Sequence, residues 1–165
     1  MRLKTILTFL IVFALAAAAS AQTKISGTQQ CAKPDQEHSI QIGDRPNHSF
    51  VISQGKCNWS KGWEIAGMQS KDTVETVFGE IRGNTLRARG YDVDTMANGD
   101  KVFYRFQAAF TLKDGVPQSC EGKWTFTGGT GKFKGIKGKG TGKLVSAAAD
   151  GSSTFELEGE YELPK

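Results

Sequence analysis

The sequence has 165 residues and a formal net charge of +4, with 21 basic and 17 acidic side chains. This length suits one folded domain, and the near balance of charges excludes a strongly basic nucleic-acid-binding protein as the default class. The 3 cysteines are an odd number, which in an oxidising compartment implies one disulfide and one leftover thiol.

The first 21 residues have the pattern of a secretory signal peptide. Arg2 and Lys4 precede an apolar run over residues 6–18, and small residues follow at 19–21. The run is shorter than the ~20 residues of a membrane-spanning helix. We therefore expect a signal peptide over 1–21 and a single secreted or periplasmic domain over 22–165 with no membrane span. A retained membrane anchor is the alternative.

A polar, irregular segment follows Cys31 and contains both histidines of the chain. His38, Asp44, Arg45 and His48 form the densest group of titratable side chains. The spacing of the histidines matches no metal-binding motif, so we expect no metal there. Surface packing is the interpretation that we favour for this group, and acid–base chemistry is the alternative.

From about residue 50 onward the pattern is that of β-strands. Apolar and polar residues alternate between the hairpin dipeptides Gly83-Asn84, Asn98-Gly99, Asp114-Gly115 and Asp150-Gly151. These turns separate strands of about ten residues, which is typical of an antiparallel meander or barrel. The predicted fold class is all-β, with a closed antiparallel β-barrel of about eight strands.

The hairpin at Asn98-Gly99 predicts which side chains share a face. A two-residue turn places Tyr91 opposite Phe106, and on the other face it places Asp92 opposite Arg105. We expect the aromatic face to point inward. Asp92 and its neighbours then remain solvent-exposed acids beside the turn, because the spacing of these acids does not fit an EF-hand calcium loop.

The next hairpin extends this aromatic face. A three-residue loop, Asp114 to Val116, places Cys120 opposite Phe110. The same register places Gly122 opposite Ala108, Trp124 opposite Phe106 and Phe126 opposite Tyr104. A two-residue turn would bring Lys123 opposite Phe106, so we favour the longer loop.

The last hairpin pairs bulky residues with glycines. A two-residue turn at Asp150-Gly151 sets Tyr161 opposite Gly140 on one face and Glu158 opposite Lys143 on the other. We expect the glycine face to point inward and the charged face to point to solvent.

Strand parity also decides between the cysteines. Cys120 falls among inward aromatic residues, so we expect the disulfide to join Cys31 to Cys57. The apolar surroundings of Cys120 would make its thiol inert. Trp59 and Trp63 share a parity and should face the core, with an exposed pair that stacks on sugars as the alternative.

The glycine- and lysine-rich stretch near residue 130 is not a phosphate-binding loop. Gly131-Lys132 is followed by Phe133 instead of Ser or Thr, so the Walker pattern fails. The segment WTFTGGTGKFKGIKGKG, residues 124–140, resembles instead the Gly-Gly-Thr-Gly-x-Phe segment of the allene oxide cyclase and dirigent-type barrels. That resemblance implies an eight-stranded antiparallel barrel with an apolar interior, in families of which some steer cyclisation or radical coupling of small hydrophobic substrates. No catalytic residue of those families can be matched here.

These observations predict a barrel that binds a small apolar or aromatic molecule in its lumen. We favour a binding protein without a cofactor over an enzyme, and we expect no nucleic-acid partner. A cyclase or isomerase that uses the same cavity, and a structural envelope protein with a solid core, are the alternatives. An inward-facing charge at Glu64, Glu75 or Arg87 would favour the enzyme. The expected lumenal ligand-binding residues are Tyr91, Tyr104, Phe106, Phe110, Trp124, Phe126 and Tyr161.

Overall fold

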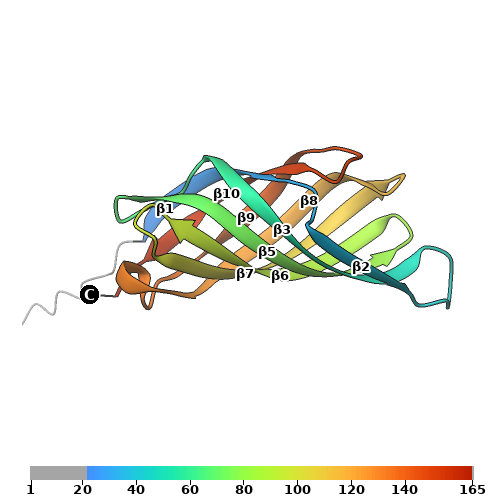
Figure 1. Ribbon diagram of the computed structural model, residues 1–165, viewed down its shortest axis with the longest axis horizontal. Helices are drawn as coiled ribbons and strands as arrows, with labels where there is room; N and C mark the ends of the chain where they lie inside the picture. Colours follow the sequence, from blue (N-terminus) through green and yellow to red (C-terminus); the bar gives the residue numbers. More distant parts are fainter. Residues whose placement is uncertain (1–21, 165) are drawn as a thin grey trace, which may run out of the picture.

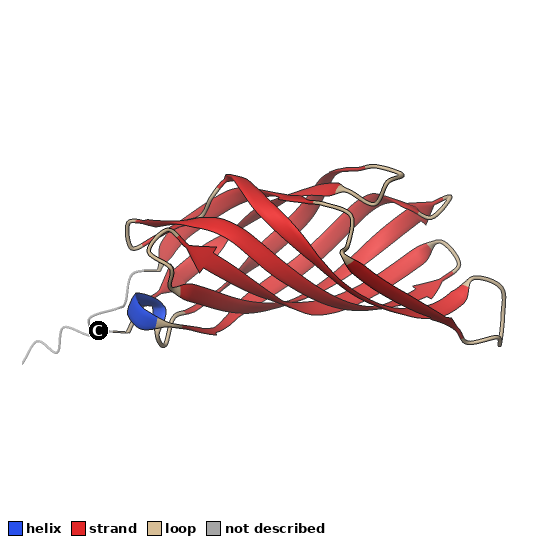
Figure 2. Ribbon diagram, in the orientation of Figure 1, coloured by secondary structure: helices blue, strands red, loops and turns tan. Residues whose placement is uncertain are grey.

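The computed structural model describes residues 22–164, and nearly all of this part of the chain is β-strand (Figure 2). The predicted signal peptide lies outside the described residues. Within them, no helix has the length and apolarity needed to cross a membrane. The elements are β1 (Thr23–Cys31), β2 (Gln36–Gln41), β3 (His48–Lys61), β4 (Glu64–Ile65), β5 (Met68–Arg82), β6 (Thr85–Met96), β7 (Lys101–Lys113), β8 (Val116–Gly129), the short 3₁₀ helix η1 (Gly131–Phe133), β9 (Lys137–Ala147) and β10 (Ser153–Glu162).

Eight of the strands close into an antiparallel barrel, as the sequence predicts. The strand order is β3-β1-β10-β9-β8-β7-β6-β5, and a further pairing between β5 and β3 closes the ring. Two short strands are not part of this ring of eight. β2 pairs with β3 (Figure 1), and β4 pairs with β5.

The strands are strongly staggered around the barrel. Following paired residues from Lys61 of β3 through β1, β10, β9, β8, β7, β6 and β5 leads back to β3 at Phe50, an offset of 61 − 50 = 11 residues. A large stagger requires steeply tilted strands and widens the barrel. Figure 1 shows this tilt as strands that run diagonally across the molecule.

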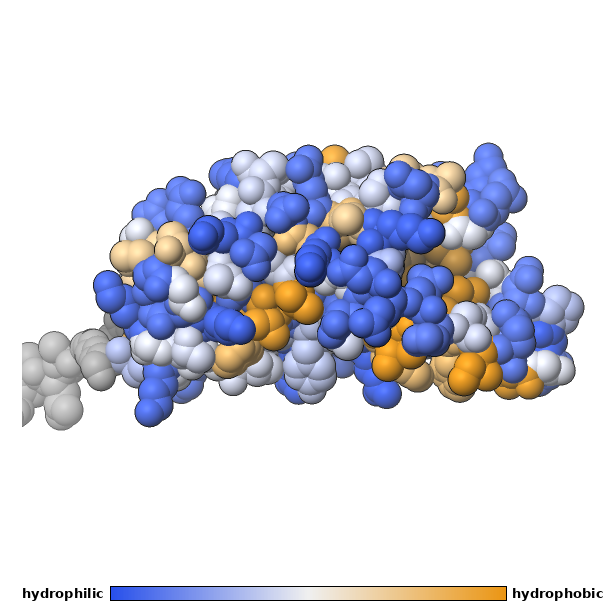
Figure 3. Space-filling view, viewed as in Figure 1, coloured by the Kyte–Doolittle hydropathy of each residue, from blue (hydrophilic) through white to orange (hydrophobic). Residues whose placement is uncertain are grey.

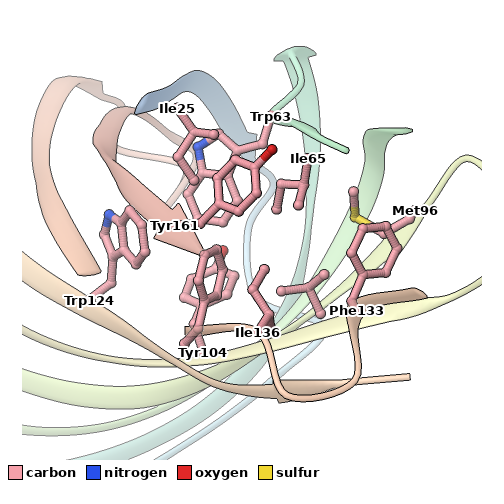
Figure 4. Close-up of a cluster of buried hydrophobic side chains, with 11 residues drawn as sticks. Ile25, Trp63, Ile65, Met96, Tyr104, Trp124, Phe133, Ile136 and Tyr161 are labelled. Carbon is pink, nitrogen blue, oxygen red and sulfur yellow. The ribbon is translucent and has the colours of Figure 1, made fainter. Parts of the chain in front are cut away.

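One end of the barrel is filled by a cluster that we term the aromatic plug. Trp63, which is completely buried, lies at its centre, with ring centroids of Tyr104, Trp124 and Phe126 at 5.0 to 5.6 Å. Figure 4 shows most of its members converging between the strands. The aromatic plug consists of Ile25, Trp63, Ile65, Met96, Val102, Tyr104, Trp124, Phe126, Phe133, Ile136 and Tyr161.

The segment that resembles the dirigent-type barrels contributes to this plug. It forms η1, in which Gly131 has a φ of +49° and Phe133 is completely buried. The backbone N–H of Lys132 donates to Asp100 at 3.1 Å, which ties this turn to the neighbouring hairpin. The glycine-rich sequence therefore builds the closed end of the barrel, seen at the left of Figure 1.

The opposite end of the barrel is open. Inward-facing apolar side chains there are half-buried, although their counterparts in the aromatic plug are buried. Leu86, Phe110, Leu144 and Phe155 belong to this group. Water therefore reaches the lumen from the end that carries the β5–β6, β7–β8 and β9–β10 turns.

The predicted register of the β6–β7 hairpin is wrong by one residue. Asp92 pairs with Tyr104, and Tyr91 pairs with Arg105. The hairpin has a three-residue loop, Ala97 to Gly99, in which Gly99 has a φ of +84°. Because side chains alternate, this slip turns Asp92 inward and leaves Tyr91 64% exposed.

The registers of the other two hairpins keep their predicted faces. All four predicted β7–β8 pairs are present, with a two-residue turn at Asp114-Gly115 and a bulge after Thr111 in place of the longer loop. In the β9–β10 hairpin Tyr161 lies opposite Gly138 instead of Gly140. That shift is by two residues, so the glycine face still points inward. The Lys143 ammonium pairs outside with Glu156 at 2.9 Å.

Candidate functional site

A lumenal cavity of about 60 Å³ lies between the aromatic plug and the open end. Its walls are mainly aromatic and aliphatic, and its amide and carboxyl side chains come from three different strands, β1, β5 and β6. The lining residues are Gln29, Glu75, Asp92, Tyr104, Phe106, Ala108, Phe110, Gly122, Lys123, Trp124, Gly142, Phe155 and Leu157.

Two carboxyl groups face this cavity. Glu75 of β5 is half-buried, and the protein surrounding it raises the pKa of its carboxyl group to about 7 by desolvation. Asp92 of β6 is only 4% exposed, and its Oδ1 atom has no hydrogen-bond partner. Burial, followed by the charges of Glu75 and Asp94, raises the pKa of Asp92 well above its usual value. The cavity therefore contains an acid, Glu75, that can change protonation near neutral pH, beside a second acid whose pKa is raised.

A third buried acid lies deeper and has a structural environment. The Thr73 hydroxyl donates to Asp94, and it accepts hydrogen bonds from Gln29 at 2.8 Å and from the Trp59 indole at 3.0 Å. Burial raises the pKa of Asp94 to about 7. This network connects β1, β3, β5 and β6 beneath the cavity.

The structure brings four of the seven predicted lumenal residues to the cavity. They are Tyr104, Phe106, Phe110 and Trp124. Phe126 and Tyr161 instead belong to the aromatic plug, and the Tyr161 hydroxyl accepts a hydrogen bond from the Ala66 N–H at 3.0 Å. The prediction that Tyr91 faces the lumen is wrong, because the one-residue shift in the β6–β7 register places its side chain on the outer surface. Binding of a ligand by any of them stays a prediction.

Gln29 and Asp92 are lining residues that were not predicted from the sequence, and the facing of Glu75 was left open. Glu75 faces inward, whereas Glu64 and Arg87 are exposed. Glu75 is two residues from buried Thr73 on β5, so the two side chains lie on the same face of the strand. Asp92 and Asp94 likewise share one face of β6. A three-residue loop at Asn98-Gly99, in place of the predicted two-residue turn, gives the register in which Asp92 and Asp94 face inward.

The predicted disulfide is confirmed, and it lies inside the barrel. Cys31 and Cys57 are bonded across β1 and β3, and both are buried. A carboxylate oxygen of Glu75 and the two sulfur atoms lie within 4.8 Å of one another. Cys120 is a free, buried thiol, and burial raises its pKa to about 11, so it is a poor nucleophile at neutral pH.

The predicted polar cluster is brought together in part, on the outside of the barrel. The His48 ring bonds Asp44 at 2.5 Å through Nδ1 and Glu80 at 2.9 Å through Nε2, and Arg45 pairs with Asp44 at 2.9 Å. His38 lies on exposed β2, paired with Ile52, and does not join them.

The charges of this cluster support one another. The carboxylates of Glu80 and Asp44 accept hydrogen bonds from the His48 ring, and these bonds, that of Glu80 most, raise the pKa of His48. The same bonds lower the pKa of each acid. The raised pKa of His48 adds stability below about pH 6.5, which is lost as pH rises through the folded value. The lowered pKa values of Asp44 and Glu80 add stability above about pH 4, which is lost on acidification. The group fastens the β2–β3 loop to β5.

A second depression follows the outer wall and is not a lumenal site. Its lining residues occur in runs of three, such as Glu121-Gly122-Lys123 and Thr141-Gly142-Lys143, in which the flanking side chains are exposed. It is a trough between two rows of outward side chains that crosses the strands. Figure 3 shows such charged side chains over much of the surface, with apolar ones among them.

Comparison with solved structures finds a similar barrel fold in a dirigent protein. The pterocarpan synthase dirigent protein GePTS1 has a TM-score of 0.53 and 12% sequence identity, with 98% of this chain and 100% of that chain covered. The pterocarpan synthase dirigent protein PsPTS1 has a TM-score of 0.47 and 13% identity, over 88% and 97% of the two chains. No known family model and no curated protein matches the sequence. The chain thus has the allene oxide cyclase and dirigent-like barrel fold, as the segment near residue 130 implies.

Proposed function

We propose that this protein binds a small, largely aromatic molecule in the barrel lumen. The observation that carries the proposal is the lumenal cavity, which has aromatic walls, lies next to the open end and is lined in part by Asp92, whose buried Oδ1 atom has no hydrogen-bond partner. Small-molecule sites combine apolar walls with a few polar groups that orient the ligand. The structural alternative predicts a solid core without a cavity.

The size of the cavity sets the position of the ligand. About 60 Å³ is far below the ~300 Å³ of a typical small-molecule site. The ligand therefore places one end in the cavity and extends its body toward the open end, between Phe110 and Phe155. These two rings contact each other across the lumen with centroids 6.3 Å apart, so they must separate when the body enters.

The cavity-blocking experiment uses two adjacent alanines of β7. Ala108 lines the cavity, whereas Ala109 is exposed on the outer wall. We expect Ala108→Phe to reduce binding of the neutral fluorophore N-phenyl-1-naphthylamine at least tenfold, and Ala109→Phe to leave it unchanged. Fluorescence titration of the disulfide-bonded domain measures both. Equal binding by the two variants, or no binding by the unmodified protein, contradicts the proposal. Native mass spectrometry of protein from its natural host would identify the ligand.

A second candidate function, proton transfer in a cyclase- or isomerase-type reaction, is favoured by Glu75. A carboxyl group with a pKa of about 7 beside a ligand suits a general acid or base at neutral pH. With the ligand identified, Glu75→Gln should abolish turnover and retain binding. A variant with unchanged turnover excludes this role.

We propose a secreted or periplasmic location, in keeping with the disulfide. Exported protein should begin at Gln22, which N-terminal sequencing tests, and an intact Met1 would contradict signal cleavage.

A further inference from the structure

We infer that the lumenal cavity selects a ligand with a cationic amine head group on an aromatic body. This inference rests on the proposed binding function and specifies the chemical class of its ligand. It depends on the polar atoms that the cavity offers, on their charge, and on the aromatic rings around them.

The polar groups that the cavity leaves free are carboxyl groups, which in their ionised form are hydrogen-bond acceptors only. Asp92 is only 4% exposed, and its Oδ1 atom has no hydrogen-bond partner. The Gln29 amide nitrogen already donates to Thr73 at 2.8 Å and to the Tyr104 hydroxyl at 3.4 Å. The carboxyl groups of Asp92 and Glu75 thus remain to meet a ligand, and a ligand that binds their ionised form must bring the donors.

No cation of the described residues neutralises these acids inside the barrel. Lys123 is the one basic residue of the cavity lining, and it is exposed on the outer wall. Arg87 and Arg89 are also exposed, and Arg89 lies over the Phe78 ring at 5.1 Å. Buried carboxylates without a counter-ion are unfavourable, so a ligand that brings a positive charge gains more than a neutral one.

The remaining lining favours the same head group. Phe106, Phe110, Trp124 and Phe155 present aromatic rings to the cavity. The faces of such rings attract cations, and their attraction is stronger where water is excluded. A carboxylate or phosphate ligand would instead meet repulsion from Asp92 and Glu75. A small ammonium group also suits a cavity of about 60 Å³.

Binding of a cation should depend on pH through these acids. Glu75 is faced by Asp92 from β6, by Tyr104 from β7, by Cys120 from β8 and by the disulfide of β1 and β3. A bound ammonium favours the ionised carboxyl groups and so releases protons near pH 7, where Glu75 titrates. Affinity should rise from pH 5 to pH 8, and fall again above about pH 10 as the amine deprotonates.

The experiment compares three matched probes by isothermal titration calorimetry at pH 7.5. They are 2-phenylethylamine, the neutral 2-phenylethanol and the anionic 3-phenylpropanoate, each titrated into the disulfide-bonded domain. We expect the amine to bind about tenfold more tightly than the alcohol, which is the size of one charged hydrogen bond, and the anion to bind most weakly. Titrations in two buffers of different ionisation enthalpy should show proton release with the amine alone.

Variants locate the effect. Asp92→Asn should weaken the amine about tenfold and change the alcohol less than about twofold. Glu121→Gln, an exposed acid on the outer wall, is the control and should change neither. If Asp92→Asn does not fold, Glu75→Gln replaces it and should weaken the amine and abolish proton release.

The results separate the two proposals. An alcohol that binds as tightly as the amine, or an amine affinity that both acid variants preserve, overturns the cationic ligand and leaves the proposed binding function intact. Failure of all three probes and of the neutral fluorophore overturns both.

Discussion

At the scale of single residues, the unusual feature is a group of acids inside an apolar barrel. Asp94 is completely buried, and its Oδ2 atom has no partner, whereas Oδ1 accepts from Thr73. Burial of a carboxylate with incomplete hydrogen bonding favours its protonated form. Buried acids of this kind lower the stability of a protein and occur most often at or next to functional sites.

The pH dependence of stability should reveal Asp94. Its pKa is raised from 3.8 to about 7 in the folded protein, so the folded state holds the proton more strongly and stability falls as pH rises from 4 to 7. Asp94→Asn removes this loss. We expect the variant to gain roughly 2–4 kcal/mol at pH 8 relative to the unmodified protein, and little at pH 4.

Urea unfolding at the two pH values measures this difference. Glu160→Gln, which changes an acid at the outer surface in an ion pair with Lys24, serves as the control. An equal effect of Asp94→Asn at both pH values would exclude ionisation of Asp94 as the cause.

At the scale of strands and hairpins, the glycines of β9 and β10 allow rings to pack on bare backbone. A Cβ atom on Gly140 would collide with the Trp124 ring and with the Glu158 carbonyl. By contrast, a Cβ atom on Gly122 would meet its nearest neighbours, Ala108 Cβ and the Gln107 carbonyl, at 3.4 Å. The glycine-rich sequence is thus a packing requirement of the barrel interior.

These two glycines should respond differently to the same change. We expect Gly140→Ala to destabilise the protein by about 1–3 kcal/mol through overpacking. Gly122→Ala should change stability by less than about 1 kcal/mol, because its backbone is extended and the methyl group has room. Midpoints of urea unfolding compare them, and similar losses in both variants would contradict the packing argument.

The hairpins also show which parts of the structure the sequence could predict. The β7–β8 pairs were predictable because apolar residues on both strands, such as Phe106 and Trp124, match in only one register. The β6–β7 hairpin was not, since Asn98-Gly99 is compatible with loops of two or three residues, and Tyr91 with Phe106 made the wrong register attractive. Sequence reasoning therefore found the aromatic walls of the candidate site and missed its acids.

At the scale of the whole molecule, closure of the barrel and the disulfide were predictable, and the division of the lumen was not. Strand number and spacing indicate a barrel, but which inward side chains meet depends on stagger and on loops such as the one that carries Trp63. The β4 region and η1 both fold over one end. This long-range packing has no local sequence signal.

Loss of the disulfide should weaken the whole barrel. Cys31 and Cys57 are separated by 26 residues, a span that includes the β2–β3 loop. We expect Cys31→Ala with Cys57→Ala to lower the free energy of unfolding by about 3–4 kcal/mol, chiefly because the unfolded chain is less constrained. Guanidinium unfolding under non-reducing conditions measures the loss. Cys120→Ala, which keeps the bridge, is the control, and an unchanged midpoint in the double variant would contradict the expectation.

The aromatic plug makes the lumen a blind tube. Because the plug fills one end, a ligand can enter and leave the lumen only through the open end, and the group that enters first lies deepest. The trailing group then stays near the rim, where the half-buried Leu86 and Leu144 sit. Under the proposed binding function, a long chain, a dye or a resin attached at that trailing position should not prevent binding, so candidate ligands can be tested as immobilised analogues.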